Sequence, residues 1–214
     1  MLIHRSGEGA WPRLLMLRHG ATPAPRDVYL GCRADPPLSN RGTEQALRAR
    51  ASLDGAGLEV VVTSPLRRAL ETATLAVPHA GLVVDGRLRE LDLGTFTGLT
   101  WEQIKASNRE AALAWRRGGA PPAGEHPLQM WRRTIEAALE IADRLGDGGG
   151  RALVVSHNGP IRALLGSSRG LEPGSARHLR VPHGCLRSIR LTPAVLHRWR
   201  EFVGQGRPRE SGAT

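Results

Sequence analysis

The chain has 214 residues, of which 40% are hydrophobic and 23% are charged, and its formal net charge is +10 at pH 7. This size and composition predict a single globular domain over 1–214 and no membrane span, because no stretch approaches the roughly 18 apolar residues that a span requires. The first residues, MLIHRSGEGAWPR, contain no apolar run of the kind that precedes a signal cleavage site, so a cytoplasmic protein is expected.

Four short apolar runs predict strands: LLML at 14–17, VVVTS at 60–64, LVV at 82–84 and ALVVS at 152–156. Runs that are apolar at every position suit strands covered on both faces, and each is followed by polar residues and then a helical pattern. Strands that alternate with helices indicate a parallel sheet. The expected fold class is therefore α/β, a three-layer α/β/α sandwich with a mainly parallel sheet.

Helices are predicted after these strands, over 40–53, 65–76, 100–116 and about 127–145. Ser39 is a suitable N-cap for the first helix, because its hydroxyl can accept a hydrogen bond from the first turn. Pro65 suits the first turn of the second helix, where its missing N–H is no loss. The glycines of GDGGG at 146–150 end the last helix.

The stretch GGAPPAGEHP at 118–127 is too rich in glycine and proline for regular structure. We therefore expect a small helical insertion over about 100–130, with a mobile loop above the edge of the sheet where a ligand would bind. The domain core is expected over about 14–200. The ends, 1–11 and 204–214, consist mainly of glycine, proline and charged residues and are expected to be frayed.

The positive charge is carried almost entirely by arginine, because Lys105 is the only lysine. Nucleic-acid-binding proteins gather their basic residues and interleave aromatic ones. Here the arginines are scattered over predicted helix faces, and aromatic residues make up only 4% of the chain. We expect no nucleic-acid partner, although some arginines can steer a small anionic molecule.

The cysteine and histidine patterns contain no metal-binding motif. Cys32 and Cys185 are far apart and too few for a disulfide framework, so reduced thiols are expected. The eight histidines include no HExxH spacing and none lies near a cysteine pair. We predict no metal and no cofactor.

Polar residues follow each predicted strand. In an open α/β sheet, ligands bind at the carboxyl ends of the strands, so residues that follow different strands can meet there. Two histidines, several arginines and a carboxylate at one rim are the groups that a phosphoryl ligand requires. In strand order these residues are Arg18 and His19, Arg67 and Arg68, Glu90 and Asp92, and His157 and Asn158.

Five motifs in this order, over about residues 14–192, resemble the RHG-motif branch of the histidine phosphatase (phosphoglycerate-mutase-like) superfamily. They are LRHGAT, ADPPLSNRGTEQA, TSPLRRALETA, RELDLGTFTGLTWEQI and VVSHNGPIRALL. The resemblance implies a nucleophile, His19, that forms a phosphohistidine, and a proton donor, Glu90. It also implies a phosphoryl clamp, formed by Arg18, Arg67 and His157. Asn158 can add an amide to this clamp, and Thr22 can donate its hydroxyl to the substrate.

These roles agree with the chemistry of phosphate esters. Their hydrolysis is among the slowest uncatalysed reactions, and catalysis comes mostly from positioning and from stabilising charge on the phosphoryl oxygens. Arginine stays charged and binds phosphate oxygens in bidentate fashion. His19 must attack as a neutral imidazole, which requires an acceptor to hold the proton on its other nitrogen. Glu90 can protonate the leaving group and then take a proton from water.

Other readings stay open for several of these residues. Arg67 can be a surface residue with Arg68 as the functional arginine, and Asp92 lies close enough to Glu90 to replace it as the acid. His19 and His157 can each be an ordinary buried histidine. The tryptophans near the insertion are expected to pack in the core rather than to bind substrate: Trp101, Trp115 and Trp131.

The sequence departs from the family pattern at two positions. One branch carries aspartate after the second histidine as the acid, whereas this chain has Asn158, which leaves that role to Glu90. The other branch often carries asparagine six residues after the nucleophile, where this chain has Pro25. One hydrogen bond to phosphate or substrate is therefore missing or replaced.

The interval between Glu90 and His157 is short compared with that of cofactor-dependent mutases, whose long insertion keeps water from the phosphoenzyme. A short lid admits water, which favours a phosphatase for small phosphomonoesters such as sugar phosphates, phosphoglycerate or a nucleotide-like phosphate. The alternatives are a cofactor-dependent phosphoglycerate mutase, a non-catalytic sensor of a phosphorylated metabolite and a polyanion-binding module. The sequence does not set the oligomeric state, and a homodimer is one option.

Overall fold

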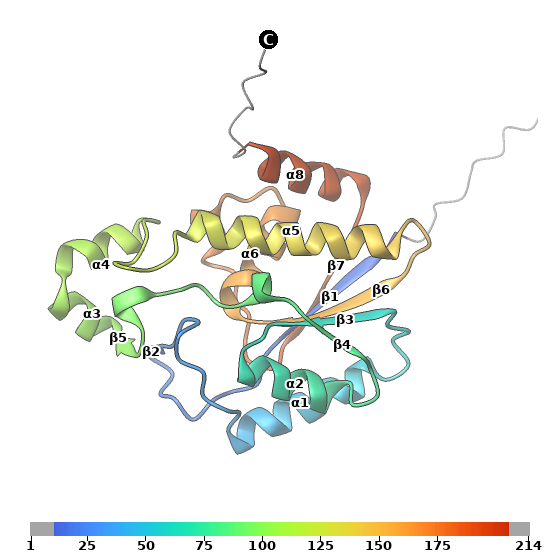
Figure 1. Ribbon diagram of the computed structural model, residues 1–214, viewed down its shortest axis with the longest axis horizontal. Coiled ribbons are helices and arrows are strands. Elements are labelled where there is room, and N and C mark those ends of the chain that lie inside the picture. Colours follow the sequence, from blue (N-terminus) through green and yellow to red (C-terminus); the bar gives the residue numbers. More distant parts are fainter. Residues whose placement is uncertain (1–10, 206–214) are drawn as a thin grey trace, which may run out of the picture.

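The computed structural model describes residues 11–205 (Figure 1). Its strands are β1 (Arg13–Arg18), β2 (Val28–Tyr29), β3 (Val60–Thr63), β4 (Leu82–Val84), β5 (Leu99–Thr100), β6 (Arg151–Ser156) and β7 (Leu186–Arg190). Its α-helices are α1 (Asn40–Leu53), α2 (Arg67–Ala76), α3 (Trp101–Ser107), α4 (Arg109–Arg116), α5 (Pro127–Leu145), α6 (Asn158–Ser168), α7 (Pro173–Ala176) and α8 (Pro193–Gly204). The frayed ends expected from the sequence lie largely outside the described residues.

The main sheet has the order β4-β3-β6-β1-β7, and β4, β3, β6 and β1 are parallel. The edge strand β7 pairs with β1 in the antiparallel direction. The prediction of a mainly parallel sheet is confirmed. β7 was missed because its sequence, LRSIR, carries polar residues at most positions and does not form an apolar run.

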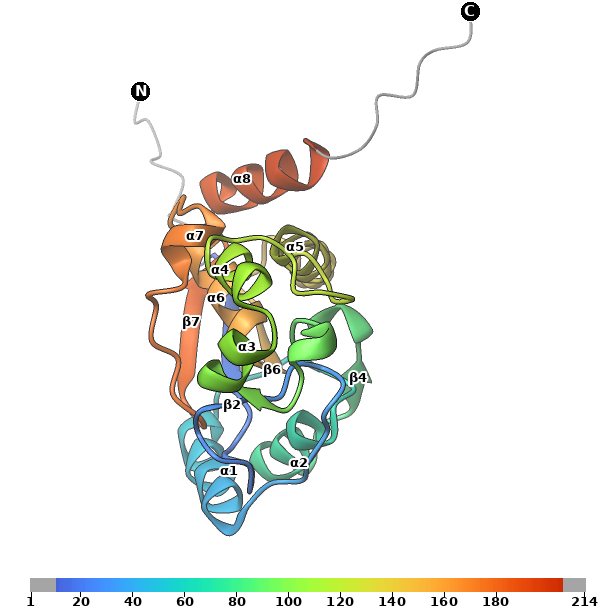
Figure 2. The same cartoon turned by 90° about the vertical axis from the view of Figure 1, so that its left-hand side faces the viewer.

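Helices cover both faces of this sheet (Figure 2). Alternate residues of the central strands point to opposite faces, so Leu14 and Met16 pack with α5 and α6, whereas Leu17 packs with α1 and α2. Helix α8 packs outside α5 and buries Trp199 completely. The three-layer α/β/α arrangement is confirmed, and none of the helices in the described part of the chain is long and apolar enough to cross a membrane.

Helix α1 begins where the sequence predicted, because the Ser39 hydroxyl accepts a hydrogen bond from the Gly42 N–H at 3.2 Å. The predicted start of α2 is wrong by two residues. Leu66 has an extended backbone and its N–H is bonded to the Ser64 hydroxyl, so Pro65 precedes the helix and Arg67 is its first residue.

The predicted helix over 100–116 is two helices that meet at Asn108. Asn108 has an extended backbone, and its side chain accepts a hydrogen bond from the Ala111 N–H at 2.9 Å, which caps α4. Together with the β2–β5 pair, α3 and α4 form the expected insertion, which has its own small core around Phe96 and Ile104. Figure 1 shows this unit beside one end of the sheet.

Candidate active site

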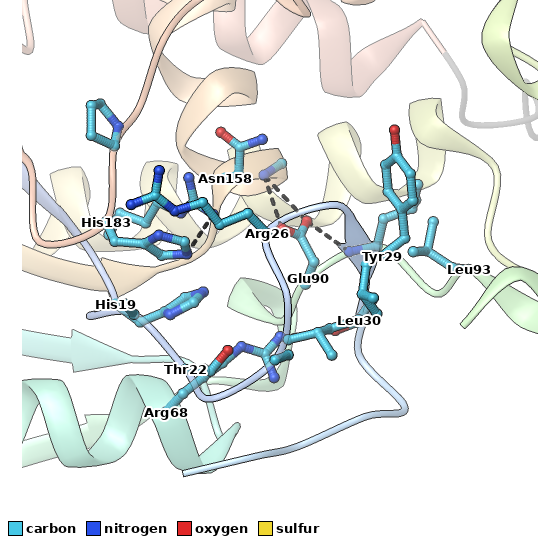
Figure 3. Close-up of a pocket in the computed structure, with 18 of the residues that line it drawn as sticks. His19, Thr22, Arg26, Tyr29, Leu30, Arg68, Glu90, Leu93, Asn158 and His183 are labelled. Atoms are coloured by element: carbon cyan, nitrogen blue, oxygen red, sulfur yellow. Dashed lines mark hydrogen bonds between the residues drawn. The ribbon is translucent and has the colours of Figure 1, made fainter. Parts of the chain in front are cut away.

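A cavity of about 850 Å³ opens at the carboxyl ends of β1 and β6, between the sheet and the insertion (Figure 3). Its walls come from several elements: the loop after β1, the first turns of α1, α2 and α6, the segment after β4, and the loop before β7. This volume lies in the range of small-molecule sites, roughly 300–1,000 Å³. The sequence placed the candidate residues at the same edge of the sheet.

His19 follows β1 and is 4% exposed. Its Nδ1 lies 2.7 Å from the Gly20 carbonyl oxygen. A carbonyl can only accept, so Nδ1 carries the proton and Nε2 keeps its lone pair. Burial lowers the pKa of His19 well below its usual range, and the positive charges of Arg68 and Arg18 lower it further. His19 is therefore held as a neutral imidazole in one tautomer, which is the form a nucleophile requires.

The turn after His19 depends on two glycines. A Cβ on Gly20 would collide with the Gly42 carbonyl, and a Cβ on Gly42 would collide with Ala21. This close approach places the start of α1 directly against the loop that holds His19. The Gly20 N–H donates to the Thr72 hydroxyl at 3.0 Å, and that hydroxyl donates to the Arg68 carbonyl at 2.7 Å.

His157 follows β6, is fully buried, and lies against His19 with ring centroids 5.0 Å apart. Its Nε2 is 2.7 Å from the Ser64 hydroxyl. That hydroxyl accepts from the Leu66 N–H and keeps a second lone pair, so this contact is compatible with either tautomer of His157. His157 is not among the residues that line the cavity. His157 Nδ1 is buried and, among the described residues, has no hydrogen-bond partner. Burial also lowers the pKa of His157 well below its usual range.

Arg18 is anchored by residues far away in the sequence. Its Nη1 donates to the Val181 carbonyl at 2.6 Å, and its Nη2 donates to Nε2 of His183 at 2.9 Å. Burial lowers the pKa of Arg18 to about 10, so the guanidinium stays charged at neutral pH. Its Nε is buried without a partner among the described residues.

The prediction that Arg67 clamps the phosphoryl group is wrong in its placement. The Arg67 side chain is 62% exposed and pairs with Glu71 at 2.7 Å on the surface of α2. The Arg68 side chain is 2% exposed and lines the cavity (Figure 3). Arg68 donates to the carbonyls of Ala34 and Gly31, and its Nε is also buried without a described partner. The alternative weighed for this position, Arg68, is the arginine that reaches the site.

Glu90 lines the cavity, and both of its carboxylate oxygens lie 3.2 Å from the Gly159 N–H at the start of α6. Asp92 is not among the residues that line the cavity. It accepts from Arg33 and from the Gly94 N–H, and these bonds give it a structural role. Among the described residues, Glu90 is therefore the carboxylate that can reach a ligand.

Asn158 and Thr22 both line the cavity, as predicted from the motifs. Trp101 and Trp131 pack away from it. Trp115 packs against the small core of the insertion, as expected, and it also lines the cavity, where its ring lies 5.2 Å from that of Tyr29 between centroids. The loop position where the family often has asparagine is Pro25, and it also lines the cavity.

Four basic side chains of the cavity lining were not found from the sequence: Arg26, Arg41, Arg162 and His183. His183 lies 5.2 Å from His19 between ring centroids, and Figure 3 shows both imidazoles facing the same space. Burial and neighbouring arginines lower the pKa of His183 to about 4. The only available signal was its histidine type, because the strand that brings it to the site, β7, has no clear pattern.

Comparison with known proteins tests the resemblance. The model of the histidine phosphatase superfamily (branch 1) matches residues 14–200. The glucosyl-3-phosphoglycerate phosphatase of Mycolicibacterium vanbaalenii is 34% identical over 168 residues, which cover 74% of this chain and 75% of that relative. The solved structure of the alpha-ribazole phosphatase from Shigella flexneri matches with a TM-score of 0.76 and 28% identity, over 85% of this chain and 91% of that one.

A 2,3-bisphosphoglycerate-dependent phosphoglycerate mutase from Methylobacterium radiotolerans is also similar, with 32% identity over 182 residues, 80% of this chain and 85% of that relative. The similar proteins therefore include phosphatases of phosphomonoesters as well as mutases. The matched region contains all five motifs and the cavity that they build. The chain belongs to the histidine phosphatase superfamily.

Proposed function

We propose that the protein hydrolyses small phosphomonoesters by transferring their phosphoryl group to Nε2 of His19. The observation that carries this proposal is the hydrogen bond from His19 Nδ1 to the Gly20 carbonyl, which leaves Nε2 unprotonated inside a cationic cavity. The buried Nε atoms of Arg18 and Arg68 and the buried Nδ1 of His157 have no described partner. Arg18 and Arg68 both line the cavity with His19, and their charged guanidinium groups suit the oxygens of a phosphoryl group.

In the first step, Nε2 of His19 forms a bond to phosphorus while the bond from phosphorus to the ester oxygen breaks. Glu90 gives its proton to the departing alkoxide, so the alcohol leaves neutral. In the second step, water attacks the phosphohistidine, Glu90 takes a proton from that water, and inorganic phosphate leaves. The arginines are already in place before the reaction, so little reorganisation is needed as charge develops on the equatorial oxygens.

The substrate is a small phosphorylated metabolite. The names of the similar phosphatases support a phosphorylated sugar derivative or a phosphorylated glycerate derivative. The aromatic pair of Tyr29 and Trp115 offers the alcohol part of the substrate a flat apolar surface. A phosphoglycerate mutase is the second candidate, because a mutase is among the similar proteins. We retain a cytoplasmic location, the absence of a metal and the absence of a nucleic-acid partner as predictions.

The test is hydrolysis of p-nitrophenyl phosphate in EDTA between pH 5 and 8 by the wild type, His19→Ala and a control, His79→Ala. His79 is exposed and lies outside the cavity, so its replacement should leave the rate within about twofold. We expect turnover in the wild type and the control, and loss of at least about 10³-fold in His19→Ala. Acid-labile phosphate trapped on the wild type and the control, but not on His19→Ala, would identify the phosphohistidine.

A second assay separates the candidates. Interconversion of 2- and 3-phosphoglycerate that depends on a bisphosphoglycerate primer, without net release of phosphate, would replace the phosphatase by a mutase. Binding of phosphate esters without either reaction would make the protein a sensor. Turnover that persists in His19→Ala would refute the proposed nucleophile.

A further inference from the structure

The cavity contains more positive charge than one phosphoryl group can neutralise. It is lined by five arginines, whereas Glu90 is the one lining carboxyl group and Asp35 pairs with Arg68 at 3.4 Å, so at least three net positive charges remain. Burial and neighbouring arginines keep the lining histidines neutral at pH 7, so they add none. A phosphoryl dianion supplies about two negative charges. Positive charge therefore remains on lining arginines outside the clamp, and because Arg162 lies near Glu90, this excess falls on two others.

Two arginines account for this excess. Arg26 lies in the loop between β1 and β2, and Arg41 lies in the first turn of α1. Among the described residues, no carboxylate forms an ion pair with Arg26 or Arg41, whereas Arg33 and Arg67 each pair with one. Both charges therefore face the cavity without a counter-ion in the described chain.

Their position differs from that of the phosphoryl clamp. After burial, the charges of Arg68 and Arg18 lower the pKa of His19 most, whereas those of Arg18, Arg26 and Arg41 lower the pKa of His183. Figure 3 shows the Arg26 side chain reaching across the cavity toward His183, on the other side of the cavity from Arg68. Arg26 and Arg41 therefore line a part of the cavity that another group of the same substrate can occupy.

We infer that the substrate carries a second anionic group on its alcohol part, a carboxylate or a phosphate, which Arg26 and Arg41 bind while Arg18 and Arg68 hold the phosphoryl group. This inference rests on the proposed phosphatase function. A charge-assisted hydrogen bond to each anionic oxygen would orient the ester so that its phosphorus faces Nε2 of His19. An uncharged ester would keep the clamp but lose this second attachment.

The experiment compares two esters that differ in one group. 3-Phosphoglycerate has a carboxylate where sn-glycerol 3-phosphate has a hydroxymethyl group. We expect kcat/KM of the wild type to be at least about tenfold higher for the carboxylate ester, because hydrogen bonds to a charged group are stronger than those to a hydroxyl. The variant Arg26→Gln/Arg41→Gln should lose this preference, mainly through KM, and keep its activity on glycerol 3-phosphate.

The matched control is Arg48→Gln/Arg50→Gln. These two residues are exposed on α1 and lie outside the cavity, and their substitution removes the same total charge. The control should retain the preference. If kcat/KM falls by the same factor for both esters in Arg26→Gln/Arg41→Gln, the two arginines steer any phosphate at long range, and the subsite is overturned. Equal kcat/KM of the two esters in the wild type would also overturn it. Fructose 1,6-bisphosphate against fructose 6-phosphate repeats the comparison for a second phosphate.

A binding measurement separates this inference from the proposed function. His19→Ala cannot form the phosphohistidine, so calorimetric titration with the same two esters reports affinity alone. Tighter binding of 3-phosphoglycerate by about tenfold, lost when Arg26→Gln/Arg41→Gln is added, supports the subsite even where the wild type shows no turnover. Equal affinity of the two esters overturns the subsite even where the wild type is an active phosphatase.

Discussion

The Glu90 carboxylate and the Gly159 N–H meet at the first turn of α6, with each carboxylate oxygen 3.2 Å from the amide nitrogen. A Cβ on Gly159 would collide with Oε1 of Glu90. The proposed proton donor, Glu90, and His157 are thereby held by one helix, because His157 is the N-cap of α6. The glycine at this position leaves the space that the carboxylate occupies.

Gly159→Ala should displace the Glu90 carboxylate and leave the fold intact. The colliding atom is the end of a flexible side chain, and alanine is favoured over glycine in a helix by about 1 kcal/mol, so thermal stability should not fall. We expect kcat for glycerol 3-phosphate to fall by about 10²-fold. The kcat for p-nitrophenyl phosphate should fall much less, because nitrophenolate can leave without being protonated. The control is Gly174→Ala, where a Cβ meets nothing within 4 Å. Equal losses for both esters would argue against general acid catalysis by Glu90.

The neighbours Arg67 and Arg68 give a second matched pair. Arg68→Gln removes a buried donor of the proposed phosphoryl clamp and should lower kcat/KM by about 10²- to 10³-fold. Arg67→Gln removes only a surface pair with Glu71, and such pairs contribute about 0–1 kcal/mol. Its kcat/KM should stay within about twofold of the wild type. A larger loss of kcat/KM in Arg67→Gln than in Arg68→Gln would show that Arg67 is the arginine that clamps the phosphoryl group.

His19 should stay neutral under mildly acidic conditions. Because burial and the two arginines lower its pKa in the folded protein, the imidazole takes up a proton only well below pH 6.5. Two-dimensional ¹H–¹⁵N spectra of the imidazoles should show His19 with a proton on Nδ1 alone at pH 6. Because the pKa of His19 is lowered, protonation of His19 does not reduce kcat/KM between pH 5.5 and 6.5. Any fall in kcat/KM with decreasing pH in this range must come from the substrate or another group. A midpoint for His19 at or above 6.5 would contradict the structure.

Arg133 is a positioning residue for Glu90. It lies on α5, donates to the carbonyls of Arg87, Arg89 and Glu90, and pairs with Glu125 through two bonds of 2.7 Å. Arg133→Lys keeps the charge but cannot reach all of these acceptors. We expect kcat for alkyl phosphates to fall by about tenfold with KM nearly unchanged, because a loosened Glu90 affects proton transfer more than binding.

The control for Arg133 is Arg144→Gln on the same helix, whose side chain pairs with Glu140 at the surface. Its kinetics should match those of the wild type. A rise in KM alone in Arg133→Lys, with kcat preserved for both alkyl and nitrophenyl esters, would show that Arg133 does not act through Glu90.

The sequence alone determined the four parallel strands of the main sheet, the class of fold and the motifs that lead to the proposed chemistry. Strands such as 14–17 and 152–156 are readable because burial on both faces requires apolar residues at every position, which is a local property. His19, Glu90 and His157 were found because each directly follows one of these segments or lies in a distinctive motif. Their meeting at one rim then follows from parallel topology.

Tertiary structure decided the rest. Arg67 and Arg68 are neighbours on α2, and because successive helical residues point about 100° apart, one is exposed and the other buried, a difference that only the packing of α2 settles. His183 reaches the site through β7, whose pairing with β1 joins residues some 170 positions apart and leaves no local pattern. Which of the many arginines line the cavity is likewise set by packing between distant segments, because a surface arginine and a buried one have the same sequence signature until the chain has folded.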